Sequence, residues 1–416
     1  MLTVQEARDR VLAALDPLPP VEVRLVDAGG LVLAKDLHAP HDLPRFDNSA
    51  MDGYAVRHID VAGASADMRV ALALTGEVKA GEVSDVILAS GTCVRIMTGA
   101  QVPRGADAVV PVEDTEEVGA KVWVAAEPPA HGHIRPAGDD VSRGAAVVSG
   151  GMELGPGELA LLASLGLSPV LVHGVPTVAI VSTGDELVSP EEEPGPGRIR
   201  DSNTVALTAL VENSGGRTII FREVADDLDS VVATLERAAG SADLVVSGGG
   251  VSVGRYDFVK QAVERLGGID LWRVAMQPGK PVVSGVVCGT PFLGLPGNPV
   301  SVHVGFEQFV RPAIRKLRGC RSLLRAVMQA TLTEGLAKKA GRLHFVRVSL
   351  VVDGATLRAT PIGRQGSHIQ SSLIGCHGVA RFPAEETELP AGAEVEVEVW
   401  ALPEADASAR TGGRDA

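Results

Sequence analysis

The sequence predicts a multidomain α/β fold: a doubly wound βαβ domain, a β-rich inserted domain and a small C-terminal β-barrel. Three observations predict it. Beyond Pro176, apolar strands alternate with helices, as in "TVAIVSTGDEL" followed by "SNTVALTALVENSGG", which is typical of parallel βαβ units. Residues 43–140 form short strand-like runs separated by Gly and Pro. Near the C-terminus, "AEVEVEVW" alternates strictly, and Asp353-Gly354 is typical of a hairpin turn.

Length and composition bound the class of protein. A chain of 416 residues exceeds one hydrophobic core, so we expect two to four domains. The net charge of −14 argues against nucleic acid or an anionic membrane as a general partner. The four cysteines lie far apart, which disfavours a zinc site or disulfide scaffold and favours a reducing, cytoplasmic compartment. No apolar run approaches the roughly 20 residues that span a bilayer.

Individual elements follow from local signals. Thr3 and Glu6 predict a capping box ahead of an N-terminal helix. Pro156 and Gly166 bound a second helix, "GPGELALLASLGL". In the βαβ region, "RTIIFREV" is a strand, "LDSVVATLERAAG" is a helix capped by Asp229, and "ADLVVSGGG" is a strand again. Cys288 falls in an apolar strand, where we expect it in the core.

A glycine loop ends the strand "ADLVVSGGG". A strand–glycine–helix junction exposes backbone N–H groups that suit a phosphate, although a tight turn without a ligand remains the alternative. The loop does not fit the dinucleotide fingerprint, because the third glycine position falls on Val253. The chain has no P-loop motif either.

Acidic residues follow three successive strands of the predicted sheet. Asp185 and Glu186 follow the first strand, Asp226 and Asp227 the second, and Asp257 the third. Each alone fits a helix cap or a solvated turn. Together, and next to a glycine loop that suits a phosphate, these acidic residues indicate a Mg²⁺ site for phosphoryl or phosphoanhydride chemistry.

Basic and hydroxyl groups come from other segments. Lys280 lies on the Pro-bounded turn "QPGKP", which suits a fixed oxyanion contact, and Ser301 opens a helix. Arg347 lies on a C-terminal strand, and Ser367 lies in the loop "GRQGSH". The polar loop "LPRFDNSAMDGYAV" opens the inserted domain and fits a functional loop or an interdomain turn equally well.

Several of these motifs together resemble one family. The stretches "FDNSAMDGYA", "VRIMTGAQVPRGADAVV", "STGDEL", "DSN", "SGGGVSVGRYDFVK", "QPGKP", "LGLPGNPVS" and "GRQGSH" occur in order from about residue 40 to 370. In this combination the chain resembles the molybdopterin molybdenumtransferases, which comprise bacterial MoeA and the E domains of gephyrin and its plant counterparts.

The resemblance implies a domain organisation and an assembly. It implies a linker and dimer domain of residues 1–44 and 139–175, an inserted domain of 45–138, a molybdopterin-binding-like βαβ domain of 176–325 and a barrel of 326–403. Residues 404–416 are expected to form a disordered tail. The family's assembly is an elongated homodimer, with each site between the βαβ domain and the partner's inserted domain.

The resemblance also implies a reaction: molybdate enters the dithiolene of adenylylated molybdopterin and AMP leaves, with Mg²⁺ assisting. Catalytic positions carried over from the family are Asp52, Thr98, Asp140, Glu186, Asp227 and Asp257, of which Glu186, Asp227 and Asp257 serve the metal. Positions for the pterin nucleotide are Ser182, Thr183, Gly184, Ser247, Gly248, Gly249, Gly250, Ser252, Gly254, Pro296, Gly297, Asn298 and Pro299. Positions for molybdate are Lys280, Ser301, Arg347 and Ser367. Gln277 stands where many relatives have a second lysine, so we expect a weaker positive field.

Three alternatives stay open. A molybdopterin adenylyltransferase has a related βαβ fold but would match the third domain alone. A gephyrin-like scaffold would need appended interaction segments. A plain nucleotide-binding module would not need the inserted domain. As partners the resemblance implies a second copy of the chain and the upstream adenylyltransferase. The net charge of −14 leads us to expect neither nucleic acid nor membrane as a partner.

Overall fold

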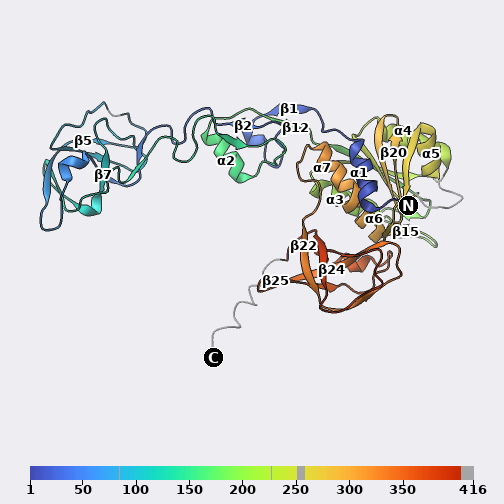
Figure 1. Ribbon diagram of the computed structural model, residues 1–416. Helices are drawn as coiled ribbons and strands as arrows, with labels where there is room; N and C mark the ends of the chain where they lie inside the picture. Colours follow the sequence, from blue (N-terminus) through green and yellow to red (C-terminus); the bar gives the residue numbers. More distant parts are fainter. Residues whose placement is uncertain (84, 226, 251–257, 404–416) are drawn as a thin grey trace.

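The structure, a computed structural model, describes residues 1–83, 85–225, 227–250 and 258–403 (Figure 1). The chain is elongated. The inserted domain lies at one end, a slender linking segment lies in the middle, and the βαβ domain lies at the other end with the C-terminal barrel beside it. Among the residues described, no helix is both long enough and apolar enough to cross a membrane.

The inserted domain is built on a six-stranded sheet in the order β7-β4-β6-β5-β9-β8. Strands β5 and β6 pair in parallel, and the other strand pairs described for this sheet are antiparallel. Apolar side chains cover both faces of the sheet, with Tyr54 and Leu72 in one core and Val94 and Ile96 in the other. The strands are β4 (Gly53–Val56), β5 (Val70–Val78), β6 (Thr92–Ile96), β7 (Ala108–Pro111), β8 (Thr115–Val118) and β9 (Lys121–Val124).

The linking segment contains two passes of the chain. Its strand pairs are β1 (Pro20–Val23) with β12 (Val170–His173), β2 (Leu37–His38) with β11 (Ala146–Val148), and β3 (Asn48–Ser49) with β10 (Ile134–Arg135). Helix α2 (Pro156–Ser164) begins at Pro156 as predicted and packs Leu162 against Leu33 and Leu154. The segment therefore has a small core of its own.

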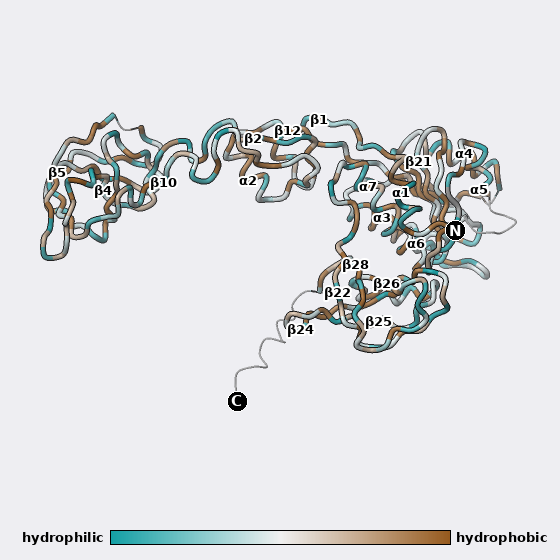
Figure 2. Tube along the Cα trace, in the orientation of Figure 1, coloured by the Kyte–Doolittle hydropathy of each residue, from teal (hydrophilic) through white to brown (hydrophobic). Residues whose placement is uncertain are grey.

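The βαβ domain has a six-stranded sheet in the order β16-β13-β17-β21-β20-β18. Strands β13 (Thr177–Thr183), β16 (Arg217–Val224), β17 (Leu244–Gly248) and β21 (Thr290–Leu295) are parallel. Strand β20 (Pro281–Val287) runs against both β21 and β18 (Gly267–Arg273), so the sheet is mixed. Apolar residues concentrate along these strands (Figure 2).

Helices cover both faces of this sheet, as a doubly wound fold requires. One face packs against α1 (Val4–Ala13), α3 (Ser202–Asn213), α6 (Pro299–Gly305) and α7 (Arg311–Leu317). The other face packs against α4 (Leu228–Ala239) and α5 (Phe258–Leu266). A π-helix, η4 (Phe306–Val310), joins α6 to α7.

Short 3-10 helices lie at Leu25–Asp27, His58–Val61, Val112–Asp114 and Gln370–Leu373. Strands β14 (Leu187–Val188) and β15 (Ile199–Arg200) form a separate pair.

Three details differ from the sequence-based expectations. The capping box of α1 is present, but α1 packs into the core of the βαβ domain, whereas residues 1–44 were expected in the linking segment. Asp227, and not Asp229, caps α4. Cys288 is exposed instead of buried, because Cys288-Gly289 turns the chain from β20 into β21.

The C-terminal domain is a closed barrel of five strands in the cyclic order β24-β25-β22-β28-β26. Val395, Val397 and Val399 face its core, as their alternation predicts, and the β24–β25 hairpin turns at Asp353-Gly354. The barrel strands are β22 (Val327–Leu332), β24 (Leu343–Asp353), β25 (Thr356–Pro361), β26 (Gly378–Phe382) and β28 (Glu394–Val399). Strand β23 (Leu336–Ala337) pairs with β27 (Glu388–Leu389), and β19 (Met276–Gln277) pairs with β24 across the domain boundary.

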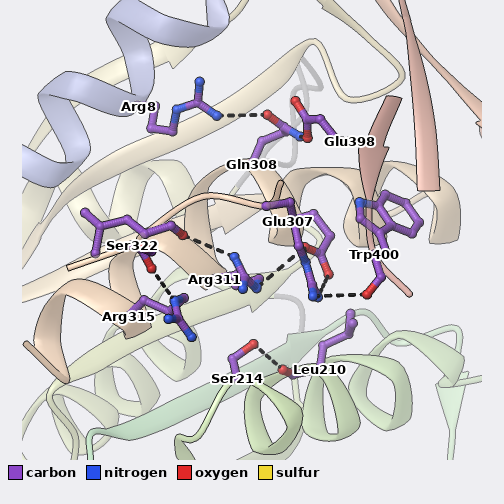
Figure 3. A network of polar contacts seen from close by, with 12 residues as sticks. Arg8, Leu210, Ser214, Glu307, Gln308, Arg311, Arg315, Ser322, Glu398 and Trp400 are labelled. Atoms are coloured by element: carbon purple, nitrogen blue, oxygen red, sulfur yellow. Dashed lines mark hydrogen bonds and ion pairs between the residues drawn. The ribbon is translucent and has the colours of Figure 1, made fainter. Parts of the chain in front are cut away.

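A buried polar network fixes the barrel to the βαβ domain (Figure 3). Glu307 on η4 accepts two hydrogen bonds from Arg325, with both N···O distances 2.9 Å. Arg325 also donates to the carbonyl of Trp400. Next to Glu307, Gln308 donates to Glu398 of the barrel. Since Arg325 precedes β22 and Trp400 follows β28, the network holds both ends of the barrel.

Candidate functional site

A cavity of about 420 Å³ lies between the βαβ domain and the barrel. We call it the interdomain cavity. Its wall is formed by the loops after β17 and β21, the turn after β19, a residue before β24 and the loop after β25. Its lining residues are Gly250, Gln277, Pro278, Gly279, Lys280, Pro281, Pro296, Gly297, Asn298, Ser301, Arg342, Gln365, Gly366 and Ser367.

The described lining of this cavity is positively charged. Lys280 comes from the βαβ domain and Arg342 from the barrel, and no described lining residue is acidic. The chain as a whole carries a net charge of −14, so the positive charge of this cavity contrasts with the charge of the rest of the protein. Ser301, only 3% exposed, adds a hydroxyl group. Such an arrangement suits a small, compact oxyanion.

The glycine loop adopts the backbone geometry that its sequence predicts. Gly249 and Gly250 have φ angles of 151° and 68°, a region that side chains disfavour. A Cβ atom on Gly250 would lie 2.4 Å from Cγ2 of Val259 and 3.2 Å from Oγ1 of Thr183. The loop therefore turns tightly at the edge of the cavity, where only glycine fits at position 250.

A residue that the sequence reasoning did not select holds two cavity loops together. Asn203 donates through Nδ2 to the carbonyl of Gly297 at 2.8 Å and to that of Gly248 at 3.4 Å. Ser247 is buried, and neither Ser247 nor Gly248 is among the described residues that line the cavity. The motif "DSN" contains Asn203, but only the fold reveals its two partners.

The predicted nucleotide-binding residues divide between two hollows. Gly250, Pro296, Gly297 and Asn298 line the interdomain cavity, and Pro299 begins helix α6 beside it. Ser182 and Gly184 line a separate hollow of about 200 Å³, which Arg222 also lines. Ser182 donates to Asp201, a buried carboxylate that caps α3. Thr183 ends β13 between the two, near Gly250. Ser252 and Gly254 lie outside the described residues.

Two of the predicted metal ligands lie at the same edge of the sheet. Thr183 and Val224 are paired in neighbouring strands, so Glu186 and Asp227 leave the sheet at matching positions, three residues later. Both side chains are exposed. The Oδ1 atom of Asp227 accepts from the backbone N–H of Ser230, and this bond lowers the pKa of Asp227.

Asp257, the third predicted ligand, lies outside the described residues. Within the described ranges, no group of three or more His, Cys, Asp or Glu residues forms a metal site. Glu186 and Asp227 supply two carboxylates at this edge, and Mg²⁺ commonly takes one or two carboxylates together with substrate phosphates.

Three predicted residues lie far from the interdomain cavity. Asp52 and Thr98 meet in the inserted domain, where the carboxylate accepts from the backbone N–H at 2.7 Å and from Oγ1 at 2.8 Å. These two hydrogen bonds lower the pKa of Asp52. Asp140 is exposed on the connection between the inserted domain and the linking segment. In Figure 1 the inserted domain stands at the opposite end of the chain from the βαβ domain.

Of the four residues predicted for molybdate, Lys280, Ser301 and Ser367 line the interdomain cavity. Arg347 does not line it, but is fully buried beneath the loop that carries Ser367. Arg342, which sequence reasoning missed, lines the cavity instead. The signal that could have found it is its place in "GRLHF", immediately before the first long barrel strand.

Comparisons with known proteins agree with this architecture. Three family models match the chain: "MoeA N-terminal region (domain I and II)" over residues 2–166, "Probable molybdopterin binding domain" over 179–316, and "MoeA C-terminal region (domain IV)" over 329–400.

Relatives match over nearly the whole length. "Molybdopterin molybdenumtransferase 2" of Mycobacterium tuberculosis is 39% identical over 408 residues, which is 97% of this chain and 100% of the relative. "Molybdopterin molybdenumtransferase" of Staphylococcus aureus is 33% identical and covers 98% of this chain and 97% of its own. A solved structure of a molybdopterin biosynthesis MoeA protein from "Pyrococcus horikosii" superposes with a TM-score of 0.83 at 34% identity, covering 96% of this chain and 99% of that one. The chain therefore belongs to the MoeA family of molybdopterin molybdenumtransferases.

Proposed function

We propose that this chain is a molybdopterin molybdotransferase, which inserts molybdate into the dithiolene of adenylylated molybdopterin and releases AMP. Its family, named for this transfer, supports a transferase of molybdenum cofactor biosynthesis that acts on a molybdopterin-related substrate. The observation that carries the proposal is the positively charged interdomain cavity in an otherwise acidic chain.

The cavity is the proposed seat of molybdate. Molybdate is a compact dianion at neutral pH, and it requires fixed donors to replace its hydration shell. Lys280 supplies a point charge, Arg342 supplies a planar fork, and Ser301 and Ser367 supply hydroxyl groups. Gln277 adds a neutral amide at the same wall, so the field rests on two cations.

The glycine loop and the neighbouring turn are the proposed seat of the pterin phosphate. Gly249 and Gly250 bring backbone close to the cavity, and Asn203 fixes that loop to the carbonyl of Gly297. A phosphate placed here would lie next to the molybdate seat, as the transfer requires. Hydrolysis of the phosphoanhydride then frees AMP from the loop.

Magnesium is the proposed metal. Glu186 and Asp227 would hold it through their exposed carboxylates, with Asp257 as the third predicted ligand. When bound, the ion would neutralise negative charge on the two phosphates of the phosphoanhydride. Asp227→Asn separates this role from capping, since Asn caps helices about as well as Asp. We expect slower AMP release with unchanged thermal stability.

A homodimer is the proposed assembly. Asp52, Thr98 and Asp140 lie too far along the elongated chain to serve the same subunit's interdomain cavity (Figure 1). In a dimer, the inserted domain of a partner could bring them there. The upstream partner is a molybdopterin adenylyltransferase, and four free cysteines fit a reducing cytoplasmic compartment.

The test is a defined reaction. The purified protein is incubated with adenylylated molybdopterin and molybdate, and AMP release is followed together with reconstitution of an apo-molybdoenzyme. We expect both signals, and we expect reconstitution to require molybdate. Release of pyrophosphate from molybdopterin and ATP would instead favour the adenylyltransferase alternative. Binding of the nucleotide without turnover would favour a scaffold or a binding module.

A further inference from the structure

Arg347 occupies an unusual place beside the interdomain cavity. It is fully buried on strand β24, and it is not one of the residues that line the cavity. Burial lowers the pKa of its guanidinium to about 10, so the group stays charged at neutral pH. Nevertheless, among the residues that the structure describes, no carboxylate is bonded to it, and its Nη1 atom has no hydrogen-bond partner there.

The guanidinium of Arg347 donates hydrogen bonds to the segment of residues 364–372. Its Nη2 atom donates to the carbonyls of Arg364 at 3.2 Å and Gly366 at 3.3 Å. Its Nε atom donates to Oγ of Ser372 at 2.9 Å, and Ser372 in turn donates to the carbonyl of Ile369. One planar fork therefore spans the loop that carries the cavity-lining residues Gln365, Gly366 and Ser367.

The backbone of Arg347 holds the same loop. Its N–H donates to Oε1 of Gln365 at 2.9 Å, and its carbonyl accepts from Nε2 of Gln365 at 3.2 Å. On the far side, the carbonyl of Ser367 accepts from the N–H of Val300, in the first turn of α6 that also carries Ser301. The loop thus connects the barrel to the helix at the floor of the cavity.

We infer that Arg347 is a positioning residue, which fixes the loop of residues 364–367 against α6 so that Ser367 presents its hydroxyl group to the anion. It acts through the loop and not by contact with the anion. An arginine is needed because two carbonyls and a hydroxyl require several donors in fixed directions, which a lysine cannot supply together. This inference rests on the proposed molybdate site.

The test compares Arg347→Lys with Arg342→Ala in the full-length protein. Hydrogen exchange of residues 362–370 is measured without any anion, and molybdate binding is measured by calorimetry. We expect Arg347→Lys to speed exchange in this loop and to weaken molybdate binding roughly ten-fold. Arg342→Ala should weaken binding without changing exchange. Ser372→Ala, which removes one partner of Arg347 outside the cavity, should change both signals in the same direction as Arg347→Lys but less.

A double variant adds a readout that general destabilisation would not produce. In a Ser367→Ala background the further loss from Arg347→Lys should shrink, because the hydroxyl that it positions is gone. In an Arg342→Ala background the loss should persist in full. Unchanged exchange with weakened binding would make Arg347 a direct ligand and overturn the inference, and so would faster exchange with unchanged binding. If the wild-type protein binds no molybdate, the proposed function fails, while the exchange data still decide whether Arg347 holds the loop.

Discussion

Arg342 supplies one of the two cations of the interdomain cavity and Gln277 supplies a neutral amide, and both residues can be changed without disturbing a core. Both line the cavity and neither is fully buried. Arg342→Ala should raise the molybdate concentration for half-maximal cofactor formation about ten- to hundred-fold, because a charge-assisted hydrogen bond is lost. Gln277→Lys should lower that concentration by adding a cation. Molybdate titrations at saturating nucleotide measure both effects.

Arg358→Ala is the matched control for this titration. Arg358 pairs with Asp353 on the exposed surface of the same barrel, away from the cavity lining. Its removal changes the net charge equally but should leave the molybdate curve in place. A similar shift in Arg358→Ala and Arg342→Ala would mean that overall charge, and not the cavity, governs molybdate affinity.

His344 makes the stability of the barrel depend on pH. It lies next to the cavity strand β19 and is 6% exposed, and within the described part of the chain neither of its ring nitrogens has a hydrogen-bond partner. Burial, together with the charges of Arg347, Lys338 and Arg342, lowers its pKa to about 4. The folded protein therefore favours the neutral ring.

As the pH falls below 6.5, the unfolded chain takes up a proton on His344 that the folded chain cannot accept until about pH 4. Stability is thus present above pH 6.5 and is lost as the pH falls through this window. We expect the unfolding temperature of His344→Leu to fall less than that of the wild type between pH 7 and pH 5. Parallel curves for the two proteins would contradict the assignment.

At the scale of elements, the network around η4 links the barrel to the βαβ domain. The Glu307 side chain is 1% exposed and lies between Arg325 and Arg311. Glu307→Gln leaves two guanidinium groups without their charge partner, which should cost roughly 3–5 kcal/mol. Glu116→Gln is the control, because its pair with Arg69 is exposed and is worth roughly 1 kcal/mol or less. Thermal unfolding distinguishes the two, and an equal loss in both would show that the network does not restrain the barrel.

The glycine loop gives a second prediction at this scale. Gly250→Ala introduces a Cβ into contact with Val259, whereas Gly289→Ala places a Cβ in open space at a similarly positive φ, 86° against 68°. Both variants carry backbone strain, so only the steric displacement of the cavity loop differs between them. We expect calorimetry to show loss of pterin-nucleotide binding in Gly250→Ala and normal binding in Gly289→Ala. Equal binding by both would reduce the loop to a turn.

Signals from neighbouring residues predicted where single helices and turns lie better than they predicted which distant segments pack together. The capping box at Thr3, the helix start at Pro156 and the hairpin at Asp353-Gly354 depend on neighbouring residues, and the structure contains all three. The reversed direction of β20 and the packing of α1 depend on contacts between distant segments. Arg342 was missed for the same reason, since its role becomes visible only when the fold places it in the same cavity lining as Lys280.

At the scale of the whole molecule, the proposed site is divided between two ends of an elongated chain. The interdomain cavity lies at one end, and the Asp52–Thr98 pair lies in the inserted domain at the other (Figure 1). In a two-fold symmetric dimer, each site would combine the cavity of one subunit with the inserted domain of its partner. Two inactive variants, Asp52→Ala and Lys280→Ala, would then carry their defects in different halves of the site.

Mixing these two variants tests the arrangement directly. A mixed dimer has one site with both defects and one site with neither, so random exchange of subunits at equal amounts should restore about a quarter of the wild-type sites. Each variant alone should stay inactive, and sedimentation should give a mass of about twice the 43.0 kDa chain for all three samples. Mixing Lys280→Ala with Arg342→Ala is the control, since both defects lie in the same half and no mixed dimer has an intact site. If Asp52→Ala and Lys280→Ala fail to complement although subunits exchange, the site lies within one chain and the shared-site proposal is wrong.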